Sequence, residues 1–377
     1  MHTADTSLIE QHLQHLWATA ATDLHLATGS TPRVRIDGKL QPIPSAPPVD
    51  ADWLTKAIDG LLTTEDQLTF QRERQLDFAF SWGTQARFRA NAFFQADRPS
   101  LALRLIPAQI PTPEQLGLPQ VCGQLVTRPH GLILMTGPTG SGKSTTLAAM
   151  IGWINQHRPV HILTIEDPIE YVHSSSMALV NQREVGADAT SFAEGLKAAL
   201  REDPDVVLVG EMRDLETIQL TLTLAETGHL VFATLHTNDA SQTVDRVIDV
   251  FPADQQEQIR TQFSMSLAAV ISQRLVPRIG GGRVAAYEVL LGTSGVSNLI
   301  REGKVRQLRN IIATGQREGM FVLEQSLGNL VSQGVITMDD ARAVSVHPED
   351  IAALHAHGAS PQVIGGAPAP ADPGRRL

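Results

Sequence analysis

Gly137-Pro-Thr-Gly-Ser-Gly142-Lys143-Ser144 is the most specific motif in this chain. It fits the pattern G-x-x-x-x-G-K-[ST], in which the backbone N–H groups of a glycine-rich loop surround phosphate groups. Residues 131–136 before it form a short apolar run, as a buried parallel strand does, and residues 145–154 after it have the apolar spacing of a helix. A glycine-rich turn that fitted this pattern by chance would not need a strand before it and a helix after it. The stretch therefore predicts a nucleoside triphosphate site between a strand and a helix.

Each part of this loop has an expected role in binding ATP and Mg²⁺. Lys143 can reach the β- and γ-phosphates, and the hydroxyl of Ser144 can ligate magnesium. The N-terminus of the following helix adds a partial positive charge. We predict that the nucleotide is bound by Gly137, Pro138, Thr139, Gly140, Ser141, Gly142, Lys143, Ser144 and Thr145.

Composition narrows the class of protein. The chain has 377 residues, 42% of them hydrophobic and 19% charged, which is typical of a soluble globular protein. Its net charge of −10 disfavours a broad nucleic-acid surface, which needs clustered Lys and Arg. The single cysteine, Cys122, excludes an intramolecular disulfide framework and a four-cysteine zinc site. No apolar run approaches the ~20 residues of a membrane span, and no signal pattern opens the chain, so we expect a cytoplasmic protein that meets the membrane only through a partner.

The first part of the chain alternates between helical and strand patterns. Asp37-Gly38 between two alternating runs is a strong hairpin signal. The expected helices cover residues 7–20 and 50–74, and the expected strands cover residues 23–26, 32–36 and 76–106.

Three arginines stand out on these expected strands. The period of two in residues 86–94 places Arg87 and Arg89 on one face, and Arg104 interrupts the apolar run 101–106. A solvated strand face would explain them. Beside a nucleotide site they could instead stabilise charge across a subunit boundary.

Pro107, Pro111 and Pro113 mark a boundary between two domains. We predict an N-terminal α+β domain at residues 1–108, a linker at 109–113, an α/β domain with a helical C-terminal part at 114–357, and a disordered tail at 358–377.

Strands and helices alternate after the boundary, which predicts a parallel sheet with helices on it. Ser191-Phe-Ala-Glu194 predicts a capping box, and Gly228 is placed to end a helix that begins at Asp214. The expected strands are 131–136, 160–165, 206–209, 230–235 and 285–291, and the expected helices include 191–201, 214–227 and a long one from Pro252 to about Leu275.

Two glutamates follow expected strands at the edge where ligands bind in open α/β sheets. Glu166 directly follows one strand, and Glu211 comes after another, next to Gly210, where many P-loop enzymes have an aspartate. We predict that Glu166 helps Ser144 to hold the metal and that Glu211 polarises the attacking water.

His229 and His236 bracket the expected strand 230–235. Lone histidines are usually structural. Beside the phosphate edge, these two could report the loss of the γ-phosphate through a changed hydrogen bond.

Together these motifs resemble one family, the bacterial secretion and type IV pilus ATPases, and especially the PilT-type pilus retraction ATPases. The resemblance covers residues 5 to about 350, and its Walker A, Asp box, Walker B and His box motifs resemble residues 137–145, 165–170, 206–214 and 227–239. In that family glycine precedes the glutamate, as Gly210 does here.

The resemblance implies a PAS-like domain followed by a RecA-like domain, in a homohexamer with ATP between subunits. Arg87 and Arg89 would be arginine fingers that reach a neighbouring subunit's ATP. Domain rotation would turn an inner-membrane platform protein, so that pilin leaves the fibre at the inner face of the membrane.

Features that the chain lacks indicate which branch of the family it resembles most. Extension and type II secretion ATPases carry a further N-terminal domain and usually a four-cysteine zinc element, for which we expect no room here. Residues 295–302 resemble the retraction signature in their second half, with Ser297 in place of an arginine. Retraction is favoured, with an accessory, PilU-like ATPase as the nearest alternative.

Two other classes of protein remain open on the sequence. A RecA-like nucleic-acid translocase would be stimulated by DNA, which the net charge of −10 disfavours. A nucleotide-sensing scaffold would bind ATP without releasing phosphate.

Overall fold

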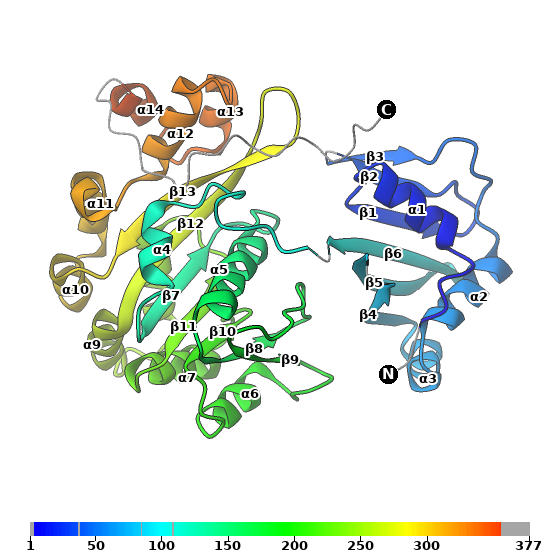
Figure 1. Ribbon diagram of the computed structural model, residues 1–377, viewed down its shortest axis with the longest axis horizontal. Helices are drawn as coiled ribbons and strands as arrows, with labels where there is room; N and C mark the ends of the chain where they lie inside the picture. Colours follow the sequence, from blue (N-terminus) through cyan, green and yellow to red (C-terminus); the bar gives the residue numbers. More distant parts are fainter. Residues whose placement is uncertain (1–3, 37, 84, 108, 356–377) are drawn as a thin grey trace. The chain divides into compact units, whose positions relative to one another are not determined.

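The computed structural model describes residues 4–36, 38–83, 85–107 and 109–355. The chain divides into two compact units, one up to Gln109 and one from Ile110 (Figure 1). In the described part of the chain, no helix has both the length and the apolar character needed to cross a membrane. The expected tail, residues 358–377, lies outside the described residues.

The first unit is an antiparallel sheet of six strands with helices packed on one face (Figure 1). The strand order is β3-β2-β1-β6-β5-β4. Its elements are α1 (Glu10–Ala18), β1 (Asp23–Ala27), β2 (Arg33–Ile36), β3 (Lys39–Pro42), α2 (Ala51–Leu61), α3 (Thr64–Glu73), β4 (Gln75–Trp82), β5 (Ala86–Gln95) and β6 (Arg98–Pro107).

The period of two predicted for β5 is confirmed. Phe88, Ala90 and Ala92 are fully buried in the core of this unit, whereas Arg89 is exposed on the other face. The pairing of β2 with β3 confirms the hairpin predicted around Gly38.

The helical stretch expected over residues 50–74 consists of two helices in the structure, α2 and α3. Thr63 interrupts the run with extended backbone and caps α3: its hydroxyl accepts from the Asp66 N–H, and Asp66 accepts from the Thr63 N–H. This reciprocal pair satisfies N–H groups that a continuous helix would not expose.

The second unit is built on a mixed sheet of seven strands in the order β13-β12-β7-β11-β10-β8-β9. Its strands are β7 (Gly131–Thr136), β8 (His161–Glu166), β9 (Leu179–Glu184), β10 (Val206–Val209), β11 (Leu230–Leu235), β12 (Leu267–Pro277) and β13 (Arg283–Leu291). All pairs are parallel except β12 with β13.

Helices cover both faces of this sheet (Figure 1). Leu132 and Leu134 of β7 belong to one hydrophobic cluster, and Ile133 and Met135 to another, as alternation along a strand buried on both sides requires. The helices are α4 (Gln120–Leu125), α5 (Lys143–His157), α6 (Phe192–Ala199), α7 (Leu215–Glu226), α8 (Ala240–Asp249), α9 (Gln256–Ser266), α10 (Ser294–Arg301), α11 (Leu308–Thr314), α12 (Leu323–Ser332), α13 (Met338–Val344) and α14 (Pro348–His355).

The long helix expected from Pro252 to about Leu275 is wrong in its second half, which is a strand in the structure. Helix α9 ends at Ser266, and the apolar run that follows is β12, which pairs with β7 on one side and β13 on the other. The spacing of apolar residues cannot distinguish a strand that is buried on both faces from a buried helix. Here the residues form a strand, because backbone hydrogen bonds to β7 and to β13 pair it on both sides.

Two of the expected helix ends are confirmed. The Ser191 hydroxyl accepts from the Glu194 N–H, although the Glu194 carboxylate pairs with Lys197 instead of completing a capping box. Gly228, with φ of 105°, follows the end of α7. Cys122 is buried in α4, and burial raises the pKa of its thiol to about 12.

Candidate functional site

The phosphate loop lies between β7 and α5 and depends on glycine at defined points. Gly137, Gly140 and Gly142 have φ of 140°, 78° and 88°, a region that other residues rarely adopt. A Cβ on Gly137 would clash with the carbonyl oxygen of Gln273 in β12. The loop therefore lies close against the neighbouring strand, with no room for a side chain at Gly137.

Gly137→Ala is expected to weaken nucleotide binding strongly, because the methyl group clashes with the Gln273 carbonyl and the backbone is strained. Forcing such a conformation costs about 1–3 kcal/mol, which corresponds to a loss of affinity of roughly 5- to 150-fold. Titration with a fluorescent ATP analogue measures it. Gly281→Ala is the matched control, because Gly281 has φ of 106° but nothing within 4 Å of its Cβ position. Equal affinities for the two variants would contradict this account.

Lys143 and Ser141 provide the polar groups of the loop. Lys143 is buried, and its Nζ donates to the carbonyl oxygens of Gly137 at 2.8 Å and Pro138 at 3.1 Å. Burial lowers the pKa of Lys143, and the carboxylates of Glu211 and Glu170 partly offset this. The Ser141 hydroxyl is buried and has no hydrogen-bond partner among the described residues. An orphaned donor and an ammonium group in a glycine cradle fit phosphate oxygens.

The first turn of α5 is tied to its surroundings. The Thr145 and Tyr171 hydroxyls lie 2.9 Å apart, and the Thr146 hydroxyl donates to Oε1 of Gln273 at 2.8 Å. Ser144 lies in the same turn and is half-buried. Sequence reasoning missed Gln273, because it placed that residue in a helix.

Glu166 ends β8 and lies at the predicted edge. Its Oε1 accepts from the Thr164 hydroxyl at 2.7 Å and from Nε2 of Gln182 at 3.1 Å. Burial raises its pKa, although both hydrogen bonds act in the opposite direction. The hydroxyl of Ser144 and the carboxyl of Glu166 are oxygen donors, which suit Mg²⁺. Among the described residues no group of three or more His, Cys, Asp or Glu side chains forms a metal cluster.

Glu211 follows β10 and is held by two side chains, those of Arg213 and His236. Its Oε1 accepts from Nε of Arg213 at 2.6 Å and from Nε2 of His236 at 3.0 Å. Burial works to raise its pKa, but Arg213 and His236 outweigh burial and lower it. Glu211 is therefore ionised at neutral pH, as a group that polarises water must be.

Gly210 owes its presence to a close backbone approach. A Cβ there would lie 3.1 Å from the Cα of Glu166 and 3.2 Å from the carbonyl oxygen of Ile165. At this position, which the sequence marked as irregular, the backbone just after β10 leaves little room for a side chain beside the end of β8.

The two histidines are not brought together. His236 follows β11 at the edge that carries the phosphate loop, whereas His229 precedes β11 and lies at the opposite edge of the sheet. His229 Nδ1 lies 2.9 Å from the carbonyl oxygen of Leu224 and 3.2 Å from the Thr227 hydroxyl. Within this subunit, these contacts place His229 in the turn after α7 and away from the site.

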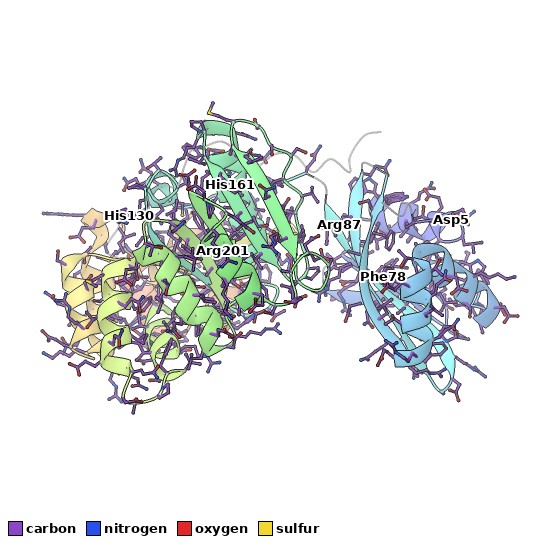
Figure 2. The ribbon with its side chains drawn as sticks, turned by 90° about the horizontal axis from the view of Figure 1, so that it is seen from below. Asp5, Phe78, Arg87, His130, His161 and Arg201 are labelled. Atoms are coloured by element: carbon purple, nitrogen blue, oxygen red, sulfur yellow. The ribbon has the colours of Figure 1, made fainter. Side chains whose placement is uncertain are left out.

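The three arginines lie on the open face of the first unit's sheet; Figure 2 labels Arg87 on β5. Arg89 and Arg104 are direct neighbours on β5 and β6. Nε of Arg104 is 2.9 Å from the Asp23 carboxylate, which also faces Arg35 at 3.7 Å. Like charges directly opposite each other destabilise a sheet, so this pairing suits a face that receives an anion.

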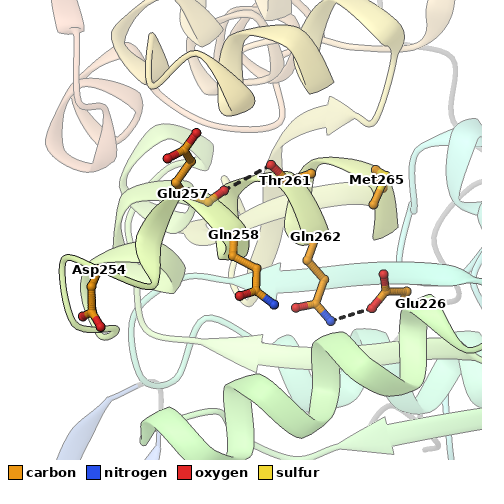
Figure 3. Close-up of a pocket in the computed structure, with 7 residues that line it drawn as sticks. All are labelled: Glu226, Asp254, Glu257, Gln258, Thr261, Gln262 and Met265. Atoms are coloured by element: carbon orange, nitrogen blue, oxygen red, sulfur yellow. Dashed lines mark hydrogen bonds between the residues drawn. The ribbon is translucent and has the colours of Figure 1, made fainter.

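A hollow of about 510 Å³ lies between α7 and α9, away from the phosphate loop in the sequence (Figure 3). Carboxylates and amides dominate its lining, which disfavours phosphate. It is lined by Glu226, Asp254, Glu257, Gln258, Thr261, Gln262 and Met265.

The fold and the phosphate loop define a P-loop nucleotide-binding protein. The sequence pattern of the family described as type II/IV secretion system protein matches residues 3–281. The chain is 50% identical over 330 residues to the type IV pilus retraction ATPase PilT of Pseudomonas aeruginosa, covering 88% of this chain and 96% of that protein. It is 39% identical over 343 residues to the type IV pilus ATPase PilU of the same organism, covering 91% of this chain and 90% of that one.

A crystal structure of the pilus retraction motor PilT with bound ADP has the same mixed α/β fold. It matches with a TM-score of 0.84 and 46% identity, over 93% of this chain and 100% of that chain. The chain belongs to the type II/IV secretion system protein family and, within it, to the pilus retraction ATPases.

Proposed function

We propose that this chain hydrolyses ATP in a homohexameric ring and so powers the retraction of type IV pili. The observation that carries this proposal is the placement of the ionised Glu211, held by Arg213 and His236, at the sheet edge that bears the phosphate loop. That the motor acts on a pilus is inferred from the relatives, which are named as pilus retraction proteins. Retraction is favoured over an accessory role, since identity to PilT is 50% and to PilU 39%.

Each residue of the site has its own role in the hydrolysis of ATP. Lys143 leaves the loop carbonyls for the β- and γ-phosphates, and the backbone N–H groups and Ser141 hold the phosphate oxygens. Mg²⁺, when held by Ser144 and Glu166, offsets charge on those oxygens. Glu211 accepts a proton from the attacking water, and His236 keeps the Glu211 carboxylate in place.

The ring would complete the site. Arg87, Arg89 and Arg104 on the open face of the first sheet would reach the γ-phosphate of a neighbouring subunit's ATP. Residues 1–108 would form a PAS-like domain, joined by a linker at 109–113 to a RecA-like domain at 114–357. The motor would act from the cytoplasmic side on an inner-membrane platform protein, and through it on the pilin fibre.

Helix α10 is the candidate for transmitting force. Ile300 is buried, whereas Arg301 and Glu302 are exposed, with Arg301 bonded to Asn298 at 3.2 Å and Glu302 to Lys304 at 2.7 Å. The Ser297 hydroxyl donates to the carbonyl oxygen of Ser264 in α9 at 2.7 Å. The serine that replaces the signature arginine thus anchors α10 to its neighbour.

The double variant Arg301→Ala, Glu302→Ala tests the proposal. We expect it to assemble and to hydrolyse ATP within about twofold of the parent rate, since exposed side chains contribute little to stability. It should fail to restore twitching in a strain without its own retraction ATPase. Arg317→Ala with Glu318→Ala, an exposed pair nearby, is the control and should restore twitching. Twitching restored equally by both variants would mean that α10 does not couple hydrolysis to retraction.

A further inference from the structure

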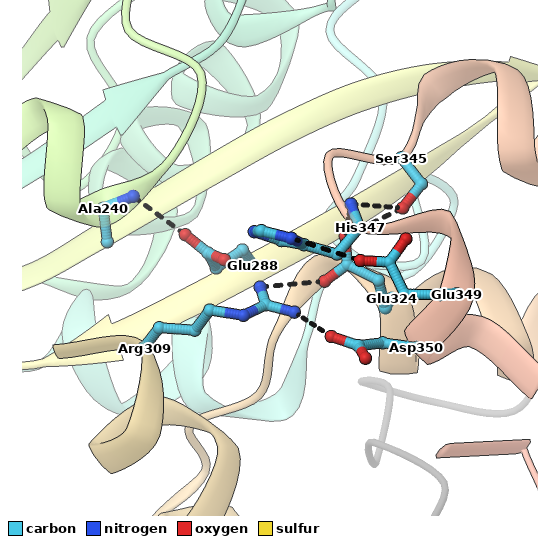
Figure 4. A network of polar contacts seen from close by, with 8 residues as sticks. All are labelled: Ala240, Glu288, Arg309, Glu324, Ser345, His347, Glu349 and Asp350. Atoms are coloured by element: carbon cyan, nitrogen blue, oxygen red, sulfur yellow. Dashed lines mark hydrogen bonds and ion pairs between the residues drawn. The ribbon is translucent and has the colours of Figure 1, made fainter. Parts of the chain in front are cut away.

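The loop that follows β11 is clasped by the antiparallel hairpin of β12 and β13. This loop begins at His236 and ends where α8 starts at Ala240. Nη2 of Arg274 in β12 donates to Oδ1 of Asn238 at 2.9 Å. The Ala240 N–H donates to Oε1 of Glu288 in β13 at 2.8 Å, in completely buried surroundings (Figure 4). Two residues of the hairpin thus fix the loop that carries His236.

The same hairpin also fixes the phosphate loop. Ser272 is the direct neighbour of Glu288 across the pair, and its hydroxyl lies 2.8 Å from that of Thr136 at the end of β7. The next residue, Gln273, packs against Gly137 and bonds Thr146. The hairpin therefore sets the distance between the two loops that the reaction needs.

Glu288 is 5% exposed and lies near both acidic and basic side chains. Burial raises its pKa to about 7, the Ala240 N–H lowers it, Asp239 and Glu324 raise it, and Arg309 lowers it. Arg274 also faces it from β12. Arg309 in turn bonds Glu324 at 3.1 Å and Asp350 at 2.6 Å, which connects Glu288 to the C-terminal helices (Figure 4).

The ionised form of Glu288 holds α8 more firmly than the neutral form. A carboxylate accepts an N–H bond about twice as strong as a neutral acceptor does. It also lies at a helix N-terminus, where the partial positive charge of the helix favours an anion. Movement at this end of α8 displaces the loop before it, and with it the imidazole of His236.

We propose that Glu288 is a positioning residue for ATP hydrolysis, which fixes the N-terminus of α8 from the β12–β13 hairpin and so keeps His236 against Glu211. This inference rests on the proposed roles of Glu211 and His236. Glu288 does not touch the nucleotide in this account. Its ionised carboxylate supports a higher kcat than its protonated form.

Glu288→Gln tests the proposal, because the amide keeps the shape and the acceptor but never ionises. At pH 8 we expect kcat to fall about fivefold, the difference between a charged and a neutral hydrogen bond, with KM for ATP within about twofold of the parent. At pH 6, where the parent is itself protonated, the two rates should differ by less than about twofold. The measurement is steady-state phosphate release from the full-length chain between pH 6 and 8.

Thermal unfolding separates positioning from a merely structural role. Between its ordinary pKa of 4.5 and about 7, the folded chain keeps a proton on Glu288 that the unfolded chain releases. Stability therefore falls as pH rises through this window, and ionised Glu288 destabilises the fold above about pH 7. Glu288→Gln should then have an equal or higher Tm at pH 8 together with a lower kcat. A loss of kcat that is equal at both pH values and accompanied by a lower Tm would overturn the proposal.

Two further variants keep the test decisive. Ala240→Pro removes the donated N–H at the first position of α8, where proline fits a helix, and it should lower kcat at pH 8 without adding to the loss in Glu288→Gln. Glu318→Gln, an exposed carboxylate, should follow the parent profile. A Glu288→Gln profile that overlies the parent's would refute the positioning role, even where Glu211→Gln still abolishes hydrolysis. Unchanged hydrolysis in Glu211→Gln would refute the catalytic assignment itself.

Discussion

Glu211→Gln is expected to keep ATP bound while lowering kcat by about 10²–10⁴-fold, the usual contribution of a positioned general base. The amide fills the same space, but it cannot accept the proton of water, and it loses the ion pair with Arg213 and the carboxylate contact with His236. Because Lys143 and the loop glycines are unchanged, the affinity for ATP should stay within a few-fold of the parent. Single-turnover phosphate release gives the rate, and titration with a fluorescent ATP analogue gives the affinity.

Glu226→Gln is the matched control for this prediction. Glu226 also lies in the second unit, but it lines the acidic hollow between α7 and α9 and bonds Gln262 there. Its substitution should leave kcat near the parent value. If Glu211→Gln hydrolyses ATP as fast as Glu226→Gln does, another group activates the water.

Arg89→Ala is expected to lower kcat by about 10³–10⁵-fold, the range known for arginine fingers. Arg89 is exposed on the open face of the sheet, opposite Arg104, so its loss should leave the core of the first unit intact. Mixing this inactive chain with inactive Lys143→Ala chains should restore partial activity. In mixed rings, an intact arginine then meets an intact phosphate loop across a subunit boundary.

Arg72→Ala serves as the control for the mixing experiment. Arg72 is exposed on α3 and pairs only with its neighbour Glu73 among the contacts described. Rings of this variant should be fully active alone. Complementation that is absent in every ratio, with hexamers verified by mass photometry, would mean that Arg89 does not act across the boundary.

The sequence predicted the phosphate edge well, because local signals determine it. The loop pattern and the short apolar strand before it are adjacent in the sequence, and each of the two carboxylates stands at the end of an apolar run that marks its strand. The bounds of β7, β10 and β11 agree with those expected from apolar runs alone. Strands β8 and β13 agree within two residues.

The contacts that fix the loop after His236 could not be predicted, because they come from the β12–β13 hairpin and β12 was expected to be helical. The run from Leu267 to Val276 is apolar without a clear period, and α9 before it is helical, so the helix was extended too far. That error hid Gln273 and Arg274, which contact the two loops from the neighbouring strand. Strand β9 was missed as well, because its sequence, Leu179–Glu184, has no alternation of apolar and polar residues. The contact of Gln182 with Glu166 was therefore missed too.

His229 and His236 were predicted together, and the sheet topology separates them within one subunit. The two histidines are symmetric about β11 in the sequence, but the ends of a strand lie on opposite edges of a sheet. With a rise of about 3.3 Å per residue, a strand of this length separates its two ends by roughly 20 Å. The direction of the strand, already implied by a parallel sheet, distinguishes the two residues.

The burial of Cys122 has a practical consequence for watching this motor at work. A thiol that is enclosed in α4 and has a raised pKa supplies almost no thiolate, the form that reacts with maleimides. An engineered surface cysteine would therefore be labelled nearly alone, without removal of the native one. Fluorophores attached in this way to the two units would report, molecule by molecule, whether their separation changes during turnover.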